Sequence, residues 1–200
     1  MPRDAVLIPL KSFATAKDRL RQGGQRDVSA LAEGLALGVL RGLRSRPIYV
    51  LGDSEDVEAF AHRHGVGYWP SPSGLNPTVT SAYQGLGDDF ERLFIVHGDL
   101  HTSEGLGEFD PVEDVTIATD RHQKGTNVLV LPTGLAFHFS YGPDSKDRHL
   151  REAERLGLSW RVIVDSPWAL DIDEPSDVEL SLQSHRGGPG APSTASPRTD

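Results

Sequence analysis

The sequence predicts an α/β fold built around a mostly parallel sheet. Short apolar runs typical of buried strands, such as Ala5-Val6-Leu7-Ile8-Pro9, alternate with segments that repeat apolar residues at helical spacing, such as 29–43. That alternation is the pattern of parallel strands joined by helices. Between residues 115 and 141, several expected strands follow one another with little helix between them. We therefore expect an antiparallel insertion or edge in this part of the sheet.

Periodicity and helix-end signals define the individual elements. The helix over 55–64 has Ser54 as its expected N-cap, acidic residues in its first turn and Gly65 after its last turn. Loops are expected after the first strand and over 70–77. The other expected helices are 29–43, 78–86, 147–156 and 175–183, and the expected strands are 5–9, 47–51, 66–69, 93–96, 115–119, 128–131, 136–141 and 161–164.

Length, composition and charge exclude several classes of function. Two hundred residues fit one domain, and the absence of cysteine excludes disulfides, zinc–thiolate sites and cysteine nucleophiles. The formal net charge of −9 argues against a DNA- or RNA-coating protein, and no apolar run is long enough to cross a bilayer. We expect a cytoplasmic enzyme with its domain over 1–183 and a disordered, Gly-, Pro- and Ser-rich tail over 184–200. The oligomeric state is not readable, and a homodimer stays a hypothesis.

Three aspartates are candidates for holding a divalent cation. Asp99 follows an expected strand and a glycine, and ligands of open α/β sheets bind beyond the carboxyl ends of the strands. Asp171 and Asp173 share one face if their segment is extended, so either could complete a two-carboxylate Mg²⁺ site with Asp99. Each reading has a structural alternative. Asp99 could cap a turn or the following helix, and Asp173 could cap the helix that begins near Pro175.

Loop residues supply candidate contacts for a nucleotide. Lys11, Lys17 and Arg19 follow the first strand, where a phosphate-binding turn belongs, although neither the Walker pattern nor GxGxxG is present. The alternative is a solvated basic loop. Asn76, within 74–76, either contacts a base edge or caps the following helix.

Two turns combine small hydroxyl residues with glycines. The first is 125–127, which contains Thr126, and the second is 140–145, which contains Gly142 and Ser145. Backbone N–H groups beside glycine can approach an oxyanion, so these turns suit a phosphate or a carboxylate. Nearby Arg121 either pairs with such a group in bidentate form or belongs to an internal Arg–Asp pair. The turns therefore predict an enzyme that acts on a phosphorylated small molecule.

Taken together and in order, these segments resemble one family: the 2-phospho-L-lactate guanylyltransferases, including those acting on phosphoenolpyruvate, of deazaflavin coenzyme (F-420) biosynthesis. The resemblance covers nearly all of residues 5–182, and no single motif carries it alone. The matching segments are Ile8-Pro9-Leu10-Lys11, Ala16-Lys17-Asp18-Arg19-Leu20, Gly74-Leu75-Asn76, Gly98-Asp99-Leu100, Asp120-Arg121, Gly125-Thr126-Asn127, 139–145, His149 and 170–177.

The resemblance implies a Rossmann-like, three-layer nucleotidyltransferase fold, with GTP as co-substrate and Mg²⁺ as cofactor. It implies that the phosphate of a small acid attacks the α-phosphorus of GTP and releases pyrophosphate. The protein would mainly position the reactants and neutralise charge. The sequence does not choose among 2-phospho-L-lactate, phosphoenolpyruvate and 3-phosphoglycerate. The alternatives are a cytidylyltransferase of the molybdopterin type and a non-catalytic nucleotide-binding relative.

The same resemblance implies roles for the candidate residues. Asp99 and one of Asp171 and Asp173 would hold Mg²⁺, and Lys17 and Asp99 would be catalytic. The remaining implied contacts are Lys11, Lys17 and Arg19 with the triphosphate, Gly74 and Asn76 with guanine, and Arg121, Thr126, Gly142 and Ser145 with the acid. The chain departs from the family pattern at His97-Gly98 before Asp99, where alanine or proline is usual, and at His101, where proline is usual.

Overall fold

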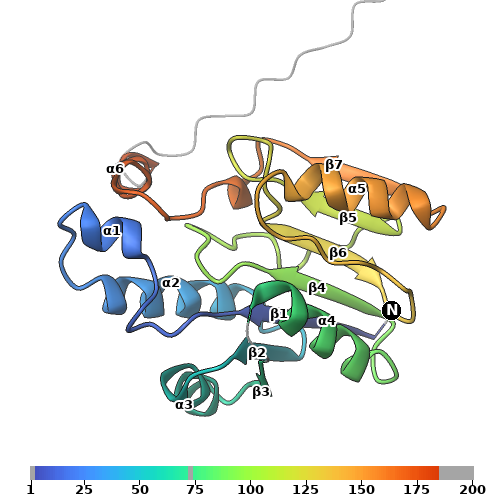
Figure 1. Ribbon diagram of the computed structural model, residues 1–200, viewed down its shortest axis with the longest axis horizontal. Coiled ribbons are helices and arrows are strands. Elements are labelled where there is room, and N and C mark those ends of the chain that lie inside the picture. Colours follow the sequence, from blue (N-terminus) through green and yellow to red (C-terminus); the bar gives the residue numbers. More distant parts are fainter. Residues whose placement is uncertain (1–2, 72–73, 185–200) are drawn as a thin grey trace, which may run out of the picture.

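A seven-stranded mixed sheet organises the chain and carries helices on both faces. The computed structural model describes residues 3–71 and 74–184. The order of the strands across the sheet is β3-β2-β1-β4-β6-β5-β7 (Figure 1). The strands are β1 (Asp4–Pro9), β2 (Ile48–Gly52), β3 (Gly67–Pro70), β4 (Arg92–Val96), β5 (Val115–Ala118), β6 (Val128–Pro132) and β7 (Trp160–Ile163).

One strand accounts for the predicted antiparallel insertion. β6 pairs antiparallel with β4 on one side and with β5 on the other. The pairs β1–β2, β1–β4, β2–β3 and β5–β7 are parallel. The antiparallel strand therefore lies inside the sheet, and the mostly parallel α/β sheet is confirmed. Strands β1 to β4 all send their carboxyl ends to the same side.

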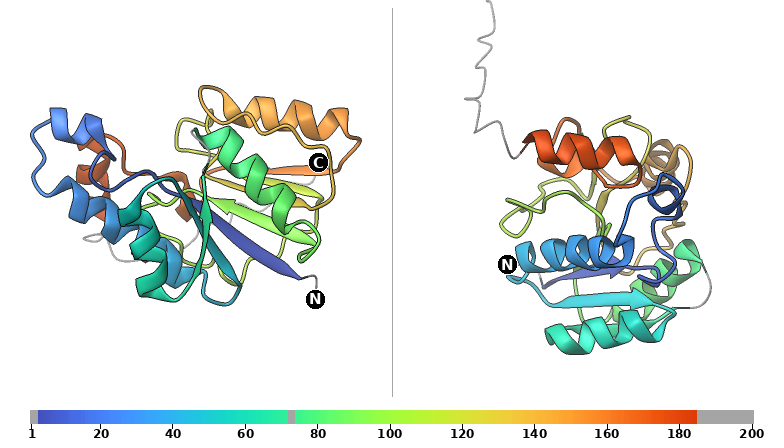
Figure 2. Two further views of the ribbon diagram at one scale, coloured as in Figure 1. Left: turned by 60° about the horizontal axis from the view of Figure 1, so that its bottom comes forward. Right: turned by 90° about the vertical axis from the view of Figure 1, so that its left-hand side faces the viewer.

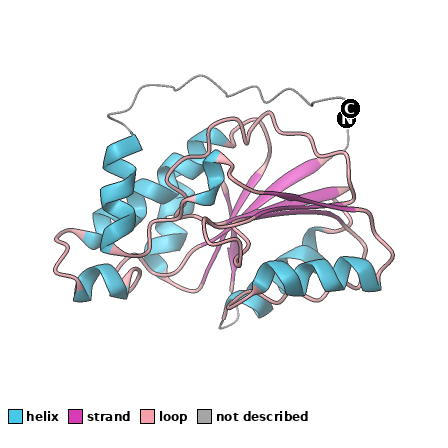
Figure 3. Ribbon diagram, turned by 90° about the horizontal axis from the view of Figure 1, so that it is seen from above, coloured by secondary structure: helices cyan, strands magenta, loops and turns pink. Residues whose placement is uncertain are grey.

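Two apolar clusters fill the two faces of the sheet. Val6 and Ile8 of β1 pack into the cluster under α2 (Val28–Gly42) and α3 (Glu55–His64). Ala5 and Leu7, which alternate with them, pack into the cluster under α4 (Leu75–Leu86) and α5 (Ser145–Arg155). Figures 2 and 3 show the sheet between these two helix layers. The three-layer arrangement is therefore confirmed.

Two further helices lie beyond the carboxyl ends of the first strands. They are α1 (Asp18–Gln22) and α6 (Pro175–Ser184), which follows the 3₁₀ helix η1 (Pro167–Ala169) (Figure 1). A small cluster of Leu20, Val28 and Ile172 joins α1 and α2 to the segment before α6. This cluster brings the chain near residue 172 next to the loop after β1, where the candidate site lies.

The predicted strand over 136–141 is wrong. Phe137, Phe139 and Tyr141 are indeed buried in the cluster under α4 and α5, which explains the alternation in the sequence. The backbone donors of the segment, however, bond to side chains and not to a neighbouring strand. The N–H groups of His138, Ser140 and Tyr141 donate to Glu152, His149 and Asn76 over 2.8, 3.0 and 2.7 Å. No ladder forms because side-chain acceptors take these donors.

Some helix boundaries also differ from the prediction. α4 begins at Leu75 and not at residue 78, which places Pro77 in its first turn, where a missing N–H costs no intrahelical bond. α5 begins at Ser145 and not at 147. The loop after β1 contains α1, so Arg19 is helical.

Two further expectations concern a membrane-spanning helix and the C-terminal tail. In the part of the chain that the structure describes, no helix is both long and apolar enough to span a membrane. Residues 185–200, where a disordered tail is predicted, lie outside the described residues.

Candidate active site

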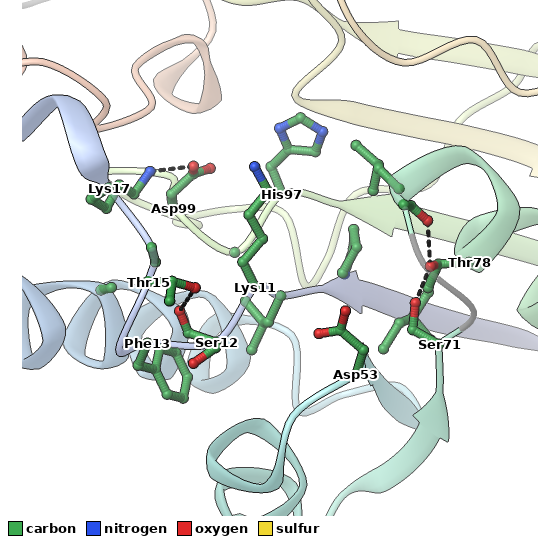
Figure 4. Close-up of a pocket in the computed structure, with 18 of the residues that line it drawn as sticks. Lys11, Ser12, Phe13, Thr15, Lys17, Asp53, Ser71, Thr78, His97 and Asp99 are labelled. Carbon is green, nitrogen blue, oxygen red and sulfur yellow. Dashed lines mark hydrogen bonds and ion pairs between the residues drawn. The ribbon is translucent and has the colours of Figure 1, made fainter.

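A cavity of about 550 Å³ opens at the carboxyl ends of β1, β2 and β4. Its lining comes from the loop after β1, the ends of β2 and β4, the start of α4 and the segment before α6 (Figure 4). This is the edge of an open α/β sheet where ligands bind. The titratable residues of the lining are Lys11, Lys17, Asp53, His97, Asp99, Asp171 and Asp173.

Lys17 connects two of the candidate metal-binding carboxylates. Its ammonium donates a hydrogen bond to Asp99 Oδ2 and another, over 2.7 Å, to Asp173 Oδ1. The Lys17 side chain is only 7% exposed. Its backbone is left-handed, with φ of 62°, at the N-cap of α1. Non-glycine residues adopt this conformation uncommonly, and such positions cluster at functional sites.

The ionisation of Lys17 and Asp99 depends on their contact. Burial would lower the pKa of the Lys17 ammonium, but Asp99 and Asp173 outweigh that effect and raise the pKa above its ordinary value. Burial would raise the pKa of Asp99, but the Lys17 ammonium outweighs it and lowers the pKa. Both groups therefore stay charged near neutral pH.

Asp171 is held beside Asp99 by a short stretch of backbone pairing. Leu100 forms an antiparallel bridge with Asp171, and the N–H of Ile172 donates to the Asp99 carbonyl over 3.0 Å. Burial raises the pKa of Asp171, and the negative charges of Asp99 and Asp173 raise it further. The structure thus gathers all three predicted aspartates in the cavity lining.

The donor set suits a hard divalent cation that binds together with phosphates. Within residues 3–71 and 74–184, no three Asp, Glu or His side chains form a group able to hold a metal on their own. Mg²⁺ commonly takes only one or two protein carboxylates and fills its other positions with water and substrate phosphates. Asp99 Oδ1 is buried and has no hydrogen-bond partner within the described residues. Asp99 with Asp173 or Asp171 therefore fits such a site.

The other two cations predicted to bind phosphate are placed differently. Lys11 lines the cavity, and its ammonium pairs with no side chain in the described part of the chain. In Figure 4 it extends across the cavity toward His97. Arg19 lies on α1 with its side chain 71% exposed and pairs with Glu174 over 3.4 Å. Lys11 thus faces the cavity, whereas Arg19 lies outside its lining.

Of the two residues predicted to contact guanine, Gly74 lines the cavity and Asn76 does not. Gly74 precedes α4 with φ of 94° and lines the cavity. Asn76 is bound to the backbone of Tyr141: its Nδ2 donates to the Tyr141 carbonyl over 3.2 Å, and its Oδ1 accepts from the Tyr141 N–H over 2.7 Å. Asn76 therefore ties the start of α4 to the turn before α5.

Arg121 forms an internal ion pair, the alternative that the sequence left open. Its guanidinium lies 2.6 Å from Asp177 Oδ1, and the Asp177 side chain is 4% exposed. Asp177 Oδ2 in turn accepts hydrogen bonds from the N–H groups of Asp173 and Glu174 over 2.9 and 2.7 Å. Arg121 thus supports the residue that fixes the backbone at Asp173, and it lies outside the cavity lining.

Thr126 and Ser145, predicted to bind the acid, form a buried hydrogen-bond chain with His149. Ser145 Oγ bonds to Thr126 Oγ1 over 3.2 Å, and Thr126 Oγ1 lies 3.1 Å from His149 Nδ1. His149 Nε2 accepts from the Ser140 N–H, so the ring proton is on Nδ1 and is donated to Thr126. Burial lowers the pKa of His149 to about 4, which keeps the ring neutral.

Gly142, the third residue of that predicted contact, has φ of 121° in the same turn. The backbone N–H of Ser145 donates to the Gly142 carbonyl over 3.1 Å. Both Thr126 and Ser145 are 2% exposed. The structure therefore gathers the three residues near the start of α5, with the two hydroxyl groups turned toward each other. All three lie outside the cavity lining.

Sequence reasoning missed two titratable residues of the cavity. Asp53 follows Gly52 at the end of β2 in the same way that Asp99 follows Gly98 after β4. The rule that pointed to Asp99 would also have found Asp53. The sequence marks His97 as a departure from a family pattern and, with His101, as a flank of Asp99 that lacks the third nitrogen ligand a zinc site would need. Its Nε2 is buried without a partner among the described residues, and its ring centroid lies 5.5 Å from that of Tyr141.

Comparison with known families identifies the chain. The family model described as "Guanylyl transferase CofC like" matches residues 4–187. The chain belongs to this family. A phosphoenolpyruvate guanylyltransferase of Thermobaculum terrenum is 30% identical over 196 residues, which are 92% of this chain and 84% of that protein. A 3-phospho-D-glycerate guanylyltransferase of Phenylobacterium zucineum is 27% identical over 190 residues, 86% of this chain and 87% of that protein. As a CofC-like guanylyl transferase, the chain is a nucleotidyltransferase enzyme.

Solved structures agree on the fold. A protein of Desulfovibrio desulfuricans G20, assigned to the nucleotide-diphospho-sugar transferases, superposes with a TM-score of 0.72 at 15% identity over 93% of this chain and 89% of that one. The 4-diphosphocytidyl-2C-methyl-D-erythritol synthase of Anaerococcus prevotii gives 0.63 at 9% identity over 93% and 99%. At such low identity the likeness shows the fold alone, and that fold is the nucleotidyltransferase type.

Proposed function

We propose that this CofC-like protein transfers GMP from GTP to the phosphate of a small phosphorylated acid, in deazaflavin coenzyme (F-420) biosynthesis. The acid is 2-phospho-L-lactate, phosphoenolpyruvate or 3-phosphoglycerate. The observation that carries the proposal is the cluster of Lys17, Asp99 and Asp173 in the cavity lining. The chain's membership of the CofC-like family links this cluster to guanylyl transfer. The names of the two relatives supply the class of acceptor.

The charge of the cavity supports a requirement for a divalent cation. Four carboxylates and two ammonium groups line it, so it is negative before any ligand enters. A nucleoside triphosphate is itself strongly negative and would be repelled by such a lining. A bound Mg²⁺ would supply positive charge that offsets the repulsion between carboxylates and phosphates and polarises the phosphoryl group. Asp99 with Asp173 or Asp171 would hold the cation.

Lys17 has two sets of possible partners in this scheme. In the structure its ammonium neutralises Asp99 and Asp173. Because Lys17 lines the cavity, its ammonium can contact the phosphates when a triphosphate binds there. Lys11, which has no side-chain partner in the described residues, supplies a second positive charge to them. Both lysines thus neutralise charge that grows on the leaving pyrophosphate.

The transfer itself needs little acid–base chemistry. An oxygen of the acceptor phosphate forms a bond to the α-phosphorus while the bond between the α-phosphorus and the bridging oxygen breaks, and the electron pair leaves with pyrophosphate. The acceptor phosphate is already ionised near neutral pH, so no general base is required. The residues act mainly by holding the acceptor in line with the departing pyrophosphate. The turn at Gly142 is the proposed contact of the acid. Thr126 and Ser145, which are buried and hydrogen-bonded to each other, support this turn, because the Ser145 N–H donates to the Gly142 carbonyl.

Pyrophosphate release tests this proposal. GTP, ATP, CTP and UTP are each supplied with each of the three acceptors in the presence of Mg²⁺, with wild-type protein and with Asp99→Ala. We expect turnover with GTP and one preferred acceptor, abolished by Asp99→Ala. Turnover with CTP alone would support the cytidylyltransferase alternative. Tight GTP binding without turnover for any acceptor would support the non-catalytic alternative.

A further inference from the structure

Asp53 is a cavity-lining carboxylate that the proposed chemistry does not use. It follows Gly52 at the end of β2 and is exposed to the cavity. No described residue forms an ion pair or a hydrogen bond with its carboxylate. It therefore differs from Asp99 and Asp173, which share the Lys17 ammonium.

The cavity has two chemically different ends. One end carries Lys17 and the carboxylates that pair with it. Figure 4 shows Asp53 on the other side of Lys11, nearer to Ser71 and Thr78. Leu51, which precedes Gly52, and Leu75, which follows Gly74, also line the cavity. A ligand whose phosphates lie at the lysine end would place its nucleoside toward Asp53.

The charge of Asp53 limits what it can contact. An ionised carboxylate is a hydrogen-bond acceptor only, so it opposes phosphates and base carbonyl groups and favours N–H or O–H donors. Guanine carries two adjacent donors, N1–H and the N2 amino group, and a carboxylate can accept from both at once in a charge-assisted, bidentate contact. The Watson–Crick edges of adenine, cytosine and uracil lack two donors side by side. A site built to accept from such a pair rejects bases that lack it.

We propose that Asp53 is the residue that selects guanine, by accepting hydrogen bonds from N1–H and the N2 amino group. This rests on the proposed function, because it assumes that the nucleotide phosphates lie at the Lys17 end. In this proposal Asp53 determines which nucleotide the enzyme accepts. Asp99 and Lys17 serve every nucleotide alike, since all share the same triphosphate.

Two purine analogues make the test specific. Inosine triphosphate lacks the N2 amino group, and xanthosine triphosphate has a carbonyl in its place. An asparagine at position 53 would keep one acceptor oxygen for N1–H and offer an amide N–H to the xanthine carbonyl. The experiment measures equilibrium binding of GTP, ITP and XTP, and kcat/KM for each, with wild type, Asp53→Asn and Glu55→Gln. Glu55 is an exposed neighbour outside the cavity lining and serves as the matched control.

We expect wild type and Glu55→Gln to prefer GTP over ITP by about tenfold and over XTP by more. Asp53→Asn should weaken GTP binding by roughly 10- to 100-fold and reverse the preference toward XTP. Equal weakening of all three nucleotides would assign Asp53 to the ribose or to general electrostatics and overturn the inference. An unchanged preference would overturn it too.

The binding measurements separate this inference from the proposed reaction. If wild type binds GTP without turnover, the proposed reaction fails and the binding preference still tests Asp53. If GTP turns over and Asp53→Asn keeps its preference, only the inference about Asp53 fails. If wild type releases pyrophosphate from CTP alone in the nucleotide screen described above, both fail.

Discussion

Asn76 holds the backbone of Tyr141 through a pair of hydrogen bonds, 3.2 Å to its carbonyl and 2.7 Å from its N–H. The contact joins two parts of the molecule that are far apart in the chain. Asn76 lies in the first turn of α4, next to the cavity-lining Gly74 and Leu75, and Tyr141 directly precedes Gly142. The proposed nucleotide side and the proposed acid side of the site are therefore linked by one amide.

Asn76→Ala should destabilise the fold and loosen the acid side of the site. It leaves the half-buried N–H and carbonyl of Tyr141 without their partner, which costs about 1–3 kcal/mol of unfolding free energy. We expect KM for the acid to rise more than KM for GTP. Asn76→Asp keeps the acceptor for the Tyr141 N–H, so its unfolding free energy and its KM for the acid should lie between those of wild type and Asn76→Ala. Urea unfolding and steady-state kinetics measure these effects, and an unchanged unfolding free energy for Asn76→Ala would contradict the role assigned to the pair.

Lys17 and Arg19 should differ sharply, although both follow β1. Lys17→Gln removes the cation that neutralises Asp99 and Asp173, and we expect kcat/KM for GTP to fall by at least about 100-fold. Arg19→Gln removes an exposed charge outside the cavity lining and should change kcat/KM by less than about threefold. Equal losses in the two variants would instead support the original expectation that both bind the triphosphate.

Arg121 should act through Asp177 and not through the substrate. Arg121→Gln leaves the buried Asp177 carboxylate without its ion pair, and we expect a loss of about 2 kcal/mol of unfolding free energy, with lower kcat. Asp177→Asn should give a similar kinetic defect, and the double variant should be clearly less impaired than the sum of the two singles, because both changes remove the same ion pair. A rise in KM for the acid in Arg121→Gln alone would show a direct substrate contact.

His149 should contribute a specific loss of stability in mild acid. Its folded pKa of about 4 lies below the ordinary value of 6.5, mainly because of burial, with His97 and Arg148 adding to the effect. Between these two pH values, His149 is protonated in the unfolded chain and neutral in the folded protein. The stabilisation is fully present above pH 6.5 and is lost as the pH falls toward 4, by about 3 kcal/mol.

Unfolding of wild type and His149→Gln across this pH range measures that contribution. The difference in unfolding free energy between them should shrink on acidification, because glutamine has no proton to take up. A difference that stays constant from pH 7 to 4.5 would show that His149 is protonated in the folded protein.

The sequence predicted the sheet well because periodicity reports burial. It predicted the strands of the parallel core and the place of Asp99, since the carboxyl ends of neighbouring strands meet at one edge. The grouping of Asp171 and Asp173 with Asp99 came from their alternation and from the family resemblance. It failed at 136–141, where burial alternates as in a strand but the backbone donors bond to side chains of α4 and α5. Alternation alone cannot distinguish these two cases.

Tertiary pairing is the other information that the sequence lacked. Whether Arg121 faces a substrate or Asp177, and whether Asn76 faces a base or Tyr141, depends on partners more than 50 residues away in the chain. Asp53 was missed for a different reason. Its signal, an aspartate after a strand and a glycine, was present in the sequence and was applied only to Asp99.

The most direct test of the central claim is the mass of the reaction product. Wild-type protein is incubated with Mg²⁺, GTP and each acceptor whose phosphate oxygens carry ¹⁸O, and the nucleotide product is analysed. We predict a guanosine diphosphate-linked acid that retains the labelled oxygens, together with unlabelled pyrophosphate, and no product from Asp99→Ala. Formation of GDP or GMP without the acid, or no product with any of the three acceptors, would contradict the proposed transfer.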